Sequence, residues 1–391
     1  MIKKILLLLF FPYISYSQGI SFFEGSFESL KKEAAKQNKF IFIDCYTTWC
    51  GPCKWLAKNV FTNKEVGNFY NQNFINYSLD MEKGEGKDLQ KQFGISAYPT
   101  LLFIDSKGNI QHRYVGACDT STFIGVGKQA LDTINNFGSL LRKYQNGNRE
   151  PEFLAKYAMV CASVYYPYNI EEYFKTQNDT QLFSEINVRL METYRPSVLS
   201  REFKYVMQNI ERFIELYGFE KIYNLTASTM SRTLYTMSNQ KQFDASKQID
   251  EYINPLEVAA KNYWKNAFLL DYYGFYKVKK YPEYIQQSNL FLNSAKTDNP
   301  AFLGKSITIV VNFVSEHIND TKLLNEFTKI ILPYSTLFSL NSNLKMAKIY
   351  IYLNQKEKAL ELLNKSEKLA QKNDQTKKEF DELMKKLNDL K

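Results

Sequence analysis

The sequence predicts two parts of different fold class, an α/β domain at the N-terminal end and an all-α region after it. Residues 40–43 form a continuous apolar run, which fits a strand buried on both faces. Strand and helix patterns then alternate over about 115 residues, as in a small α/β domain. Beyond Asn135 the strand patterns fade and apolar residues recur at helical spacing. We therefore expect an α/β domain over residues 18–138 and an α-helical domain over residues 139–391.

The first 17 residues have the pattern of a secretory signal peptide. Lys3 and Lys4 precede a short apolar run, and Ser15, Tyr16 and Ser17 follow it. Small residues at positions −3 and −1 favour cleavage after Ser17. The apolar run is too short to span a bilayer, which takes roughly 20 apolar residues. We expect residues 1–17 to direct export, to the periplasm and without stable membrane insertion.

Helix and strand patterns follow one another in a regular order through residues 18–138. Phe27, Leu30 and Ala34 recur at helical spacing and predict a short amphipathic helix over residues 27–37. Further strands are expected at residues 74–79, 100–104 and 110–115. Turn residues at 105–109 join the last two strands into a hairpin. Further helices are expected at residues 51–71, 86–93 and 119–136.

Residues 139–391 are rich in Tyr, Asn, Lys and Leu, and the clearest helical pattern lies near their end. Ala347, Tyr350, Ala359, Leu363 and Ser366 fall at the offsets of a tetratricopeptide-type helical hairpin. The usual Trp and closing Pro of that motif are absent, and no clean 34-residue period is present. Degenerate helical repeats and a plain irregular helical domain therefore both stay open.

Composition and charge exclude several classes of protein. Of 391 residues, 45% are apolar and 23% are charged, which excludes a disordered or collagen-like chain. Five cysteines are too few for a scaffold held together by disulfides. The formal net charge of +9 is mild, and the basic side chains are not concentrated on a motif. We therefore expect no nucleic-acid partner.

Cys50 and Cys53 form a Cys-x-x-Cys motif shortly after the apolar strand. Two intervening residues place the thiols one helical turn apart, near enough to form a disulfide. Pro52 suits the first turn of a helix, because its missing N–H would have no partner there in any case. Cys50 then lies at the helix N-terminus, where backbone N–H groups and the helix dipole stabilise a thiolate. We expect Cys50 to attack a substrate disulfide, and Cys53, one turn inside and more shielded, to resolve the mixed disulfide intramolecularly.

Asp44 stands six residues before Cys50, at the end of the apolar strand. Partial burial would raise the pKa of this carboxyl through desolvation. It could then take the proton from Cys53 as that thiol attacks. A carboxylate that bonds a nearby loop fits the spacing equally well, and on spacing alone both interpretations stay open.

Residues at about 38–135 resemble the thioredoxin-like family, and in particular are similar to exported thioredoxin-like proteins and to the C-terminal domain of the membrane thiol:disulfide interchange protein. The resemblance is carried by Asp44, the run at 49–54, the run at 98–100 and Gly116. It implies a thioredoxin-like fold in which Asp44 is the buried proton acceptor.

The same resemblance implies a cis peptide bond before Pro99, with this proline facing the cysteine pair. It also implies that substrates dock on the backbone of Tyr98 in the manner of an added strand. The substrate-binding residues that we expect are Trp49, Gly51, Pro52, Tyr98 and Pro99.

Three positions depart from the family pattern. Tyr98 stands where Thr, Ile or Val is usual. The lysine that accompanies the buried acid in many thioredoxins falls near Asn76. An insertion at residues 82–86 lengthens a loop, as in the exported relatives.

Other chemistries fit the remaining residues less well. A zinc site needs two further ligands, but there is no second Cys-x-x-Cys motif, and His112 and His317 are solitary. Lys54 stands where a haem-attachment motif requires His. We therefore expect no metal and no organic cofactor. We expect Cys45 and Cys161 to be buried.

Cys118 follows Gly116, close to the expected substrate face. A third redox thiol and a cysteine with no redox role both fit this position.

Together these features predict an exported thiol–disulfide oxidoreductase that reduces disulfide-containing proteins through Cys50 and Cys53. The Gly-Pro dipeptide between the cysteines resembles reducing members of the family. A membrane thiol–disulfide electron donor is then the expected partner that reduces the pair again. The alternative is a partner-binding helical adaptor, in which the thioredoxin fold serves mainly as a scaffold.

Overall fold

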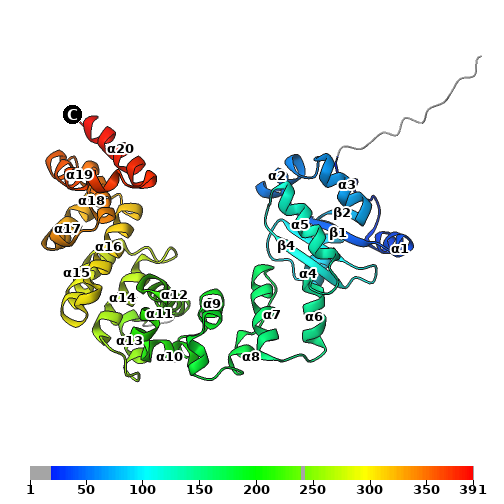
Figure 1. The fold of residues 1–391 in the computed structure, drawn as a ribbon, viewed down its shortest axis with the longest axis horizontal. Coiled ribbons are helices and arrows are strands. Elements are labelled where there is room, and N and C mark those ends of the chain that lie inside the picture. The colour runs from blue at the N-terminus through cyan, green and yellow to red at the C-terminus, as the bar shows by residue number, and fades with distance from the viewer. Residues whose placement is uncertain (1–18, 239–242, 391) are drawn as a thin grey trace, which may run out of the picture. The chain divides into compact units, whose positions relative to one another are not determined.

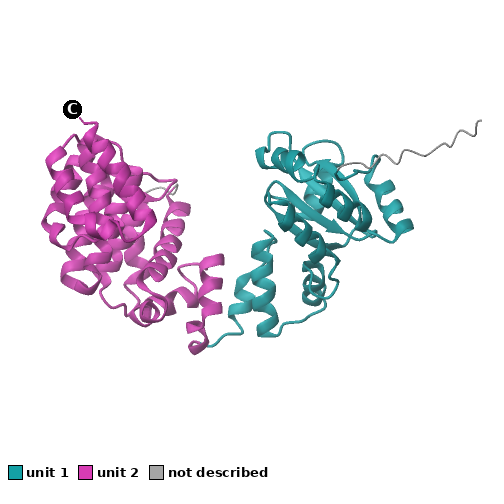
Figure 2. Ribbon diagram, turned by 45° about the horizontal axis from the view of Figure 1, so that its top comes forward, with its two compact units in different colours: residues 1–178 teal, residues 179–391 magenta. Residues whose placement is uncertain are grey.

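A computed structural model describes residues 19–238 and 243–390 of the chain (Figure 1). The signal peptide expected at residues 1–17 lies outside these residues. The chain divides into two compact units, residues 1–178 (unit 1) and residues 179–391 (unit 2) (Figure 2). In the described part of the chain, no helix is both long and apolar enough to cross a bilayer.

Unit 1 contains a four-stranded sheet and the helices that surround it. Its elements are α1 (Phe27–Gln37), β1 (Phe40–Tyr46), α2 (Gly51–Asn59), α3 (Lys64–Asn73), β2 (Phe74–Asp80), α4 (Gly86–Phe93), β3 (Thr100–Ile104), β4 (Ile110–Val115), α5 (Thr120–Leu131), α6 (Phe137–Gln145), α7 (Pro151–Ser163) and α8 (Ile170–Phe174). The strands and the hairpin expected from the sequence are present, and so are the helices expected at 27–37 and 86–93.

The single helix expected at residues 51–71 is wrong, because the chain forms two helices there. The first, α2, ends with Val60 as its C-cap. The second, α3, begins after Asn63, whose side chain accepts hydrogen bonds from the backbone N–H groups of Glu65 and Val66. This N-cap satisfies donors that the start of a helix leaves unpaired, and it marks a new helix where the apolar spacing alone suggested continuity.

The strand order in the sheet is β2-β1-β3-β4, with β1 parallel to β2 and antiparallel to β3. Strand β1 is central, and both of its faces are buried. Ile41 and Ile43 belong to the apolar cluster on one side, and Phe42 belongs to the cluster on the other. The continuous apolar run at 40–43 therefore folds as predicted, and it brings the end of β1 to the cysteine motif.

Unit 1 continues past the thioredoxin-like sheet into α6, α7 and α8. Helix α6 packs on β4 so closely that a Cβ atom on Gly138 would lie 2.1 Å from the carbonyl oxygen of Ile110. Phe137 and Tyr157 belong to an apolar cluster that also takes in Ile110. The boundary expected between residues 138 and 139 falls inside α6, whereas the compact units divide after residue 178.

All regular elements among the described residues of unit 2 are helices. Its elements are η1 (Thr180–Phe183), α9 (Glu185–Tyr194), α10 (Arg201–Gln208), α11 (Ile210–Tyr217), α12 (Phe219–Met237), α13 (Ala245–Ile253), α14 (Lys261–Gly274), α15 (Tyr281–Asp298), η2 (Pro300–Phe302), α16 (Leu303–His317), α17 (Thr321–Ile331), η3 (Leu332–Leu337), α18 (Leu340–Tyr352), α19 (Lys356–Ala370) and α20 (Asp374–Asn388). The all-α character expected beyond the sheet is confirmed.

Helices α18 and α19 pack against each other as a hairpin. Ala347 and Tyr350 on α18 are buried, as are Ala359, Leu363 and Ser366 on α19. These are the positions whose spacing suggested a tetratricopeptide-type hairpin, and that interpretation stays a prediction.

Candidate active site

Cys50 and Cys53 lie at the start of α2 and are joined by a disulfide, with their Cα atoms 5.3 Å apart. Cys50 is the N-cap residue in extended conformation, and Pro52 lies in the first helical turn. The Sγ atom of Cys50 accepts a hydrogen bond of 3.1 Å from the backbone N–H of Cys53. The predicted placement of Cys50 at a helix N-terminus therefore agrees with the structure.

The greater shielding expected for Cys53 is not seen. Cys50 is 3% exposed and Cys53 is 6% exposed. Both residues are buried in this disulfide-bonded form.

Trp49, directly before the cysteine pair, is 66% exposed, and its indole N–H forms hydrogen bonds. Its indole N–H donates to both carboxylate oxygens of Glu82, at 3.1 Å each. The rings of Trp49 and Tyr98 form an edge-to-face contact, with their centroids 6.0 Å apart. The Tyr98 hydroxyl in turn accepts a hydrogen bond of 2.7 Å from the Gln90 side chain. These contacts bring the segment that ends in Pro99 beside the cysteine motif.

The peptide bond between Tyr98 and Pro99 is cis, as the resemblance implies. The carbonyl oxygen of Pro99 accepts a hydrogen bond of 2.9 Å from the backbone N–H of Gly116. Gly116 has a φ of +107°, a left-handed conformation that side chains disfavour. The hydrogen bond from Gly116 to Pro99 joins the residue before β3 to the residue after β4.

Asp44 is 5% exposed and lies in β1, paired in register with Ser78 of β2. Its Oδ2 atom accepts a hydrogen bond of 3.0 Å from the Ser78 hydroxyl. Its Oδ1 atom is buried and has no hydrogen-bond partner among the described residues. Burial raises the pKa of Asp44 to about 7, and the bond from Ser78 offsets only part of this effect. Within the described part of the chain, the hydrogen-bond partner of the carboxyl thus lies on a neighbouring strand.

Three residues around the site were not singled out by the sequence. Ser78 contacts the buried acid, whereas Asn76, two residues earlier, pairs in register with Phe42 and bonds outside the site. Ser78 lies on the same face of β2 as Asn76, but only the strand register shows that it meets Asp44. Glu82 lies in the loop already recognised as an insertion. No sequence signal points to Gln90.

The other three cysteines are free thiols, and all are buried, as expected for Cys45 and Cys161. Desolvation raises the pKa of Cys118 to about 11 and that of Cys161 to about 12. Burial also raises the pKa of Cys45. These thiols are protonated near neutral pH, a state in which a cysteine is a poor nucleophile.

Potential metal ligands are not gathered at this site. In residues 19–238 and 243–390, no group of three or more His, Cys, Asp or Glu side chains is placed to hold a metal ion.

Residues 27–131 match the family model described as a thioredoxin-like domain. The thiol:disulfide interchange protein DsbD of Actinobacillus pleuropneumoniae is 30% identical over 101 residues, which cover 25% of this chain and 17% of that protein. Thioredoxin-2 of Pyricularia oryzae is 32% identical over 77 residues, or 19% of this chain and 42% of that protein. This chain therefore spans less than half the length of either relative.

A solved structure with the same kind of similarity is that of a Bacteroides thetaiotaomicron protein proposed to be a disulphide-isomerase. It is 46% identical, and the match covers 30% of this chain and 96% of that chain with a TM-score of 0.28.

Proposed function

We propose that the protein is an exported reductase of protein disulfides, from the premise that residues 27–131 are a thioredoxin-like domain. The observation that carries the proposal is the Cys50–Cys53 disulfide at the N-terminus of α2. A pair that closes one helical turn apart can accept and return two electrons without a cofactor.

The reaction proceeds in two thiol–disulfide exchange steps. The Cys50 thiolate attacks one sulfur of the substrate disulfide, and the other substrate sulfur leaves as a thiolate and takes a proton. The Cys53 thiolate then attacks the Cys50 sulfur, and the second substrate sulfur leaves as a thiolate and takes a proton. The substrate has gained two electrons and two protons, and the enzyme is left with the Cys50–Cys53 bridge.

The backbone at the start of α2 supports the role of Cys50 as nucleophile. The N–H of Cys53 points at the Cys50 sulfur, and the same N–H would stabilise a thiolate there once the disulfide is open. Attack by Cys53 is intramolecular, which gives it an effective concentration that no free thiol reaches.

Asp44 is the group that we assign to proton transfer from Cys53. A pKa of about 7 leaves both protonation states populated near neutral pH, which suits a group that accepts and later returns a proton. Its unpaired Oδ1 atom is available to accept that proton. Ser78 holds the other carboxylate oxygen and so acts as a positioning residue.

The substrate-binding surface that we propose surrounds the disulfide. Trp49, Gly51 and Pro52, the neighbours of Cys50 in the chain, are exposed, whereas Pro99 is buried and Tyr98 is half-buried. A substrate strand would pair with the backbone of Tyr98.

Trapping tests the thiol chemistry directly. A Cys53→Ser variant cannot resolve the mixed disulfide, so we expect it to retain substrate proteins through Cys50 that mass spectrometry can identify. The Cys50→Ser variant is the matched control and should retain none. Absence of adducts with Cys53→Ser, in cells where the protein is present, would contradict the proposed activity.

The reduction potential tests the direction of electron flow. Equilibration with glutathione should give a value close to that of thioredoxin, about −270 mV, because a reductase must be a poorer oxidant than its substrates. A value above about −180 mV would make the protein an oxidase. Reduction of the pair by a membrane thiol–disulfide donor follows from the proposed direction.

Export rests on residues 1–17. If these residues are a signal peptide, the protein isolated from cells should begin at Gln18 and come from the periplasmic fraction. An N-terminal mass that retains Met1, with the protein in the cytoplasm, would contradict export.

A helical adaptor remains the second candidate, favoured by the large helical unit at residues 179–391. In that case the double variant Cys50→Ser/Cys53→Ser would restore a deletion strain fully. A reductase predicts no restoration.

A further inference from the structure

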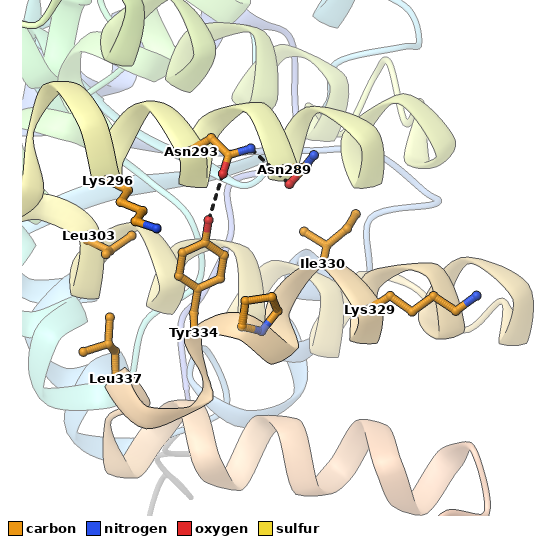
Figure 3. A pocket seen from close by; sticks show the side chains of 9 residues that line it. Asn289, Asn293, Lys296, Leu303, Lys329, Ile330, Tyr334 and Leu337 are labelled. Carbon is orange, nitrogen blue, oxygen red and sulfur yellow. Dashed lines mark hydrogen bonds between the residues drawn. The ribbon is translucent and has the colours of Figure 1, made fainter.

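A pocket of about 490 Å³ lies in unit 2, well away in sequence from the thiol chemistry (Figure 3). Its walls come from α15, the start of α16, the end of α17 and η3. The lining residues are Asn289, Asn293, Lys296, Leu303, Lys329, Ile330, Pro333, Tyr334 and Leu337. The volume falls in the range of roughly 300–1,000 Å³ that ligand pockets occupy.

A hydrogen-bonded chain fixes the polar side of this pocket. The Tyr334 hydroxyl donates to the Oδ1 atom of Asn293 at 3.1 Å, and the Nδ2 atom of Asn293 donates to the Oδ1 atom of Asn289 at 3.3 Å. Both bonds are drawn in Figure 3. Because this direction uses the oxygen of Asn289, its NH₂ group is left as a donor with no partner among the described residues. Tyr334 is buried, so the chain is anchored at its base.

The pocket is positively charged and contains no carboxylate. Lys296 and Lys329 lie on opposite sides of Tyr334 in Figure 3. Neither lysine forms an ion pair or a side-chain hydrogen bond within residues 19–238 and 243–390, although Glu326 stands one turn before Lys329. Two unpaired cations beside a free amide donor favour a ligand that carries carboxylates.

The rest of the lining is apolar. Leu303, Ile330 and Pro333 line the pocket together with Leu337, and Leu337 is 51% exposed. Leu332, next to Pro333 in the chain, is 55% exposed. A small inorganic anion would pair with the lysines but leave this apolar surface in water. A protein segment can do both.

We propose that this pocket binds an acidic segment of a partner protein. A large apolar side chain of the segment packs against Tyr334 and Leu337, and carboxylates on either side of it pair with Lys296 and Lys329. The proposal is independent of the thiol chemistry, since it uses residues of unit 2 alone.

The test uses the full-length protein and a labelled probe peptide of eight residues, six acidic residues around a central Leu-Phe pair. Fluorescence anisotropy should show saturable binding at about 50 mM NaCl that weakens as salt screens the charges. The variant Lys296→Glu/Lys329→Glu should lose at least about tenfold in affinity, and Leu337→Ala about threefold to tenfold. The matched control Lys368→Glu/Lys372→Glu removes the same charge from exposed lysines outside the pocket, and it should bind as the wild type does.

Three outcomes would overturn the proposal. The first is equal loss in the pocket and control variants, which would reduce the effect to net charge. The second is unchanged affinity for a probe with Ala in place of Leu-Phe, which would reduce it to simple anion binding. The third is binding to vesicles of anionic phospholipid, abolished by Lys296→Glu/Lys329→Glu while the peptide does not bind. Cys50→Ser should leave peptide binding unchanged, so failure here is separate from failure of the reductase assignment.

Discussion

At the residue scale, the side chain of the buried acid in β1 forms a single hydrogen bond among the described residues. Asp44 has Ser78 on one oxygen and no partner on the other among the described residues. The residue of β2 that pairs with Asp44 in register is Ser78, not a lysine. Desolvation therefore dominates and raises the pKa of this carboxyl to about 7. The ionised carboxylate that would accept a proton is therefore destabilising in the folded protein.

Replacing Asp44 with Asn should stabilise the oxidised protein at pH 8 far more than at pH 4. The folded carboxyl keeps its proton up to a pKa of about 7, whereas the unfolded one loses it near 3.8. The contribution of Asp44 to the free energy of unfolding is therefore fully present below pH 3.8. It is lost as the pH rises from 3.8 to about 7, by about 4 kcal/mol in all. Asn resembles the protonated form and escapes this loss.

The difference in stability between wild type and Asp44→Asn is measured by urea unfolding at pH 4 and pH 8, with hydrogen exchange of β1 peptides as the readout. Glu24→Gln changes an exposed carboxyl of the same unit and serves as control. A stability difference between wild type and Asp44→Asn that is equal at the two pH values would contradict the burial argument.

At the element scale, α6 is joined to the sheet by close backbone packing. Gly138 lets the helix approach Ile110, and Arg142 donates a hydrogen bond of 3.2 Å to the Gln111 side chain of β4. The Asn136 side chain caps the helix by accepting from the N–H of Ser139. Helix α6 thus packs directly on β4.

A Gly138→Ala variant should lower the free energy of unfolding of unit 1 by about 1–3 kcal/mol or more, because the new methyl group meets backbone atoms of β4. Gly125→Ala is the matched control. It lies in helix α5 with nothing within 4 Å of an added Cβ, so it should be neutral or stabilise by about 0.5–1 kcal/mol. Thermal unfolding of both variants measures the contrast, and equal effects would rule out the close approach.

At the scale of the whole molecule, the chain separates into unit 1, which carries the cysteine pair, and the larger helical unit 2. We infer that α6, α7 and α8 fold with the thioredoxin-like sheet. The reason is the cluster in which Leu140 and Tyr157 pack beside Phe137 and Ile110. These helices extend unit 1 beyond residues 27–131, which match the family model.

Two fragments test this inference. Residues 19–178 should unfold cooperatively, and residues 19–138 should be less stable by about 3 kcal/mol, because Phe137 and Ile110 lose their apolar cover. Urea unfolding of the two fragments measures the difference. Equal stability would show that the three helices add nothing to the sheet.

Much of unit 1 could be predicted because its signals are local. The apolar run at 40–43 and the hairpin residues at 105–109 each depend on neighbours in the chain, and both folded as predicted. The helix break before Asn63 was missed, since the apolar spacing runs through it. Helix α5 ends at Leu131, five residues before the predicted end, because end positions depend on packing.

Local sequence patterns specify the two fold classes and the placement of Cys50 and Cys53 at a helix start, because spacing within one turn fixes which groups are neighbours. The tertiary structure decided which residues surround that pair. Ser78 reaches Asp44 through strand register, and Glu82 reaches Trp49 across a loop. Such contacts join residues more than 30 positions apart, and they exist only once the sheet has set which strands lie side by side.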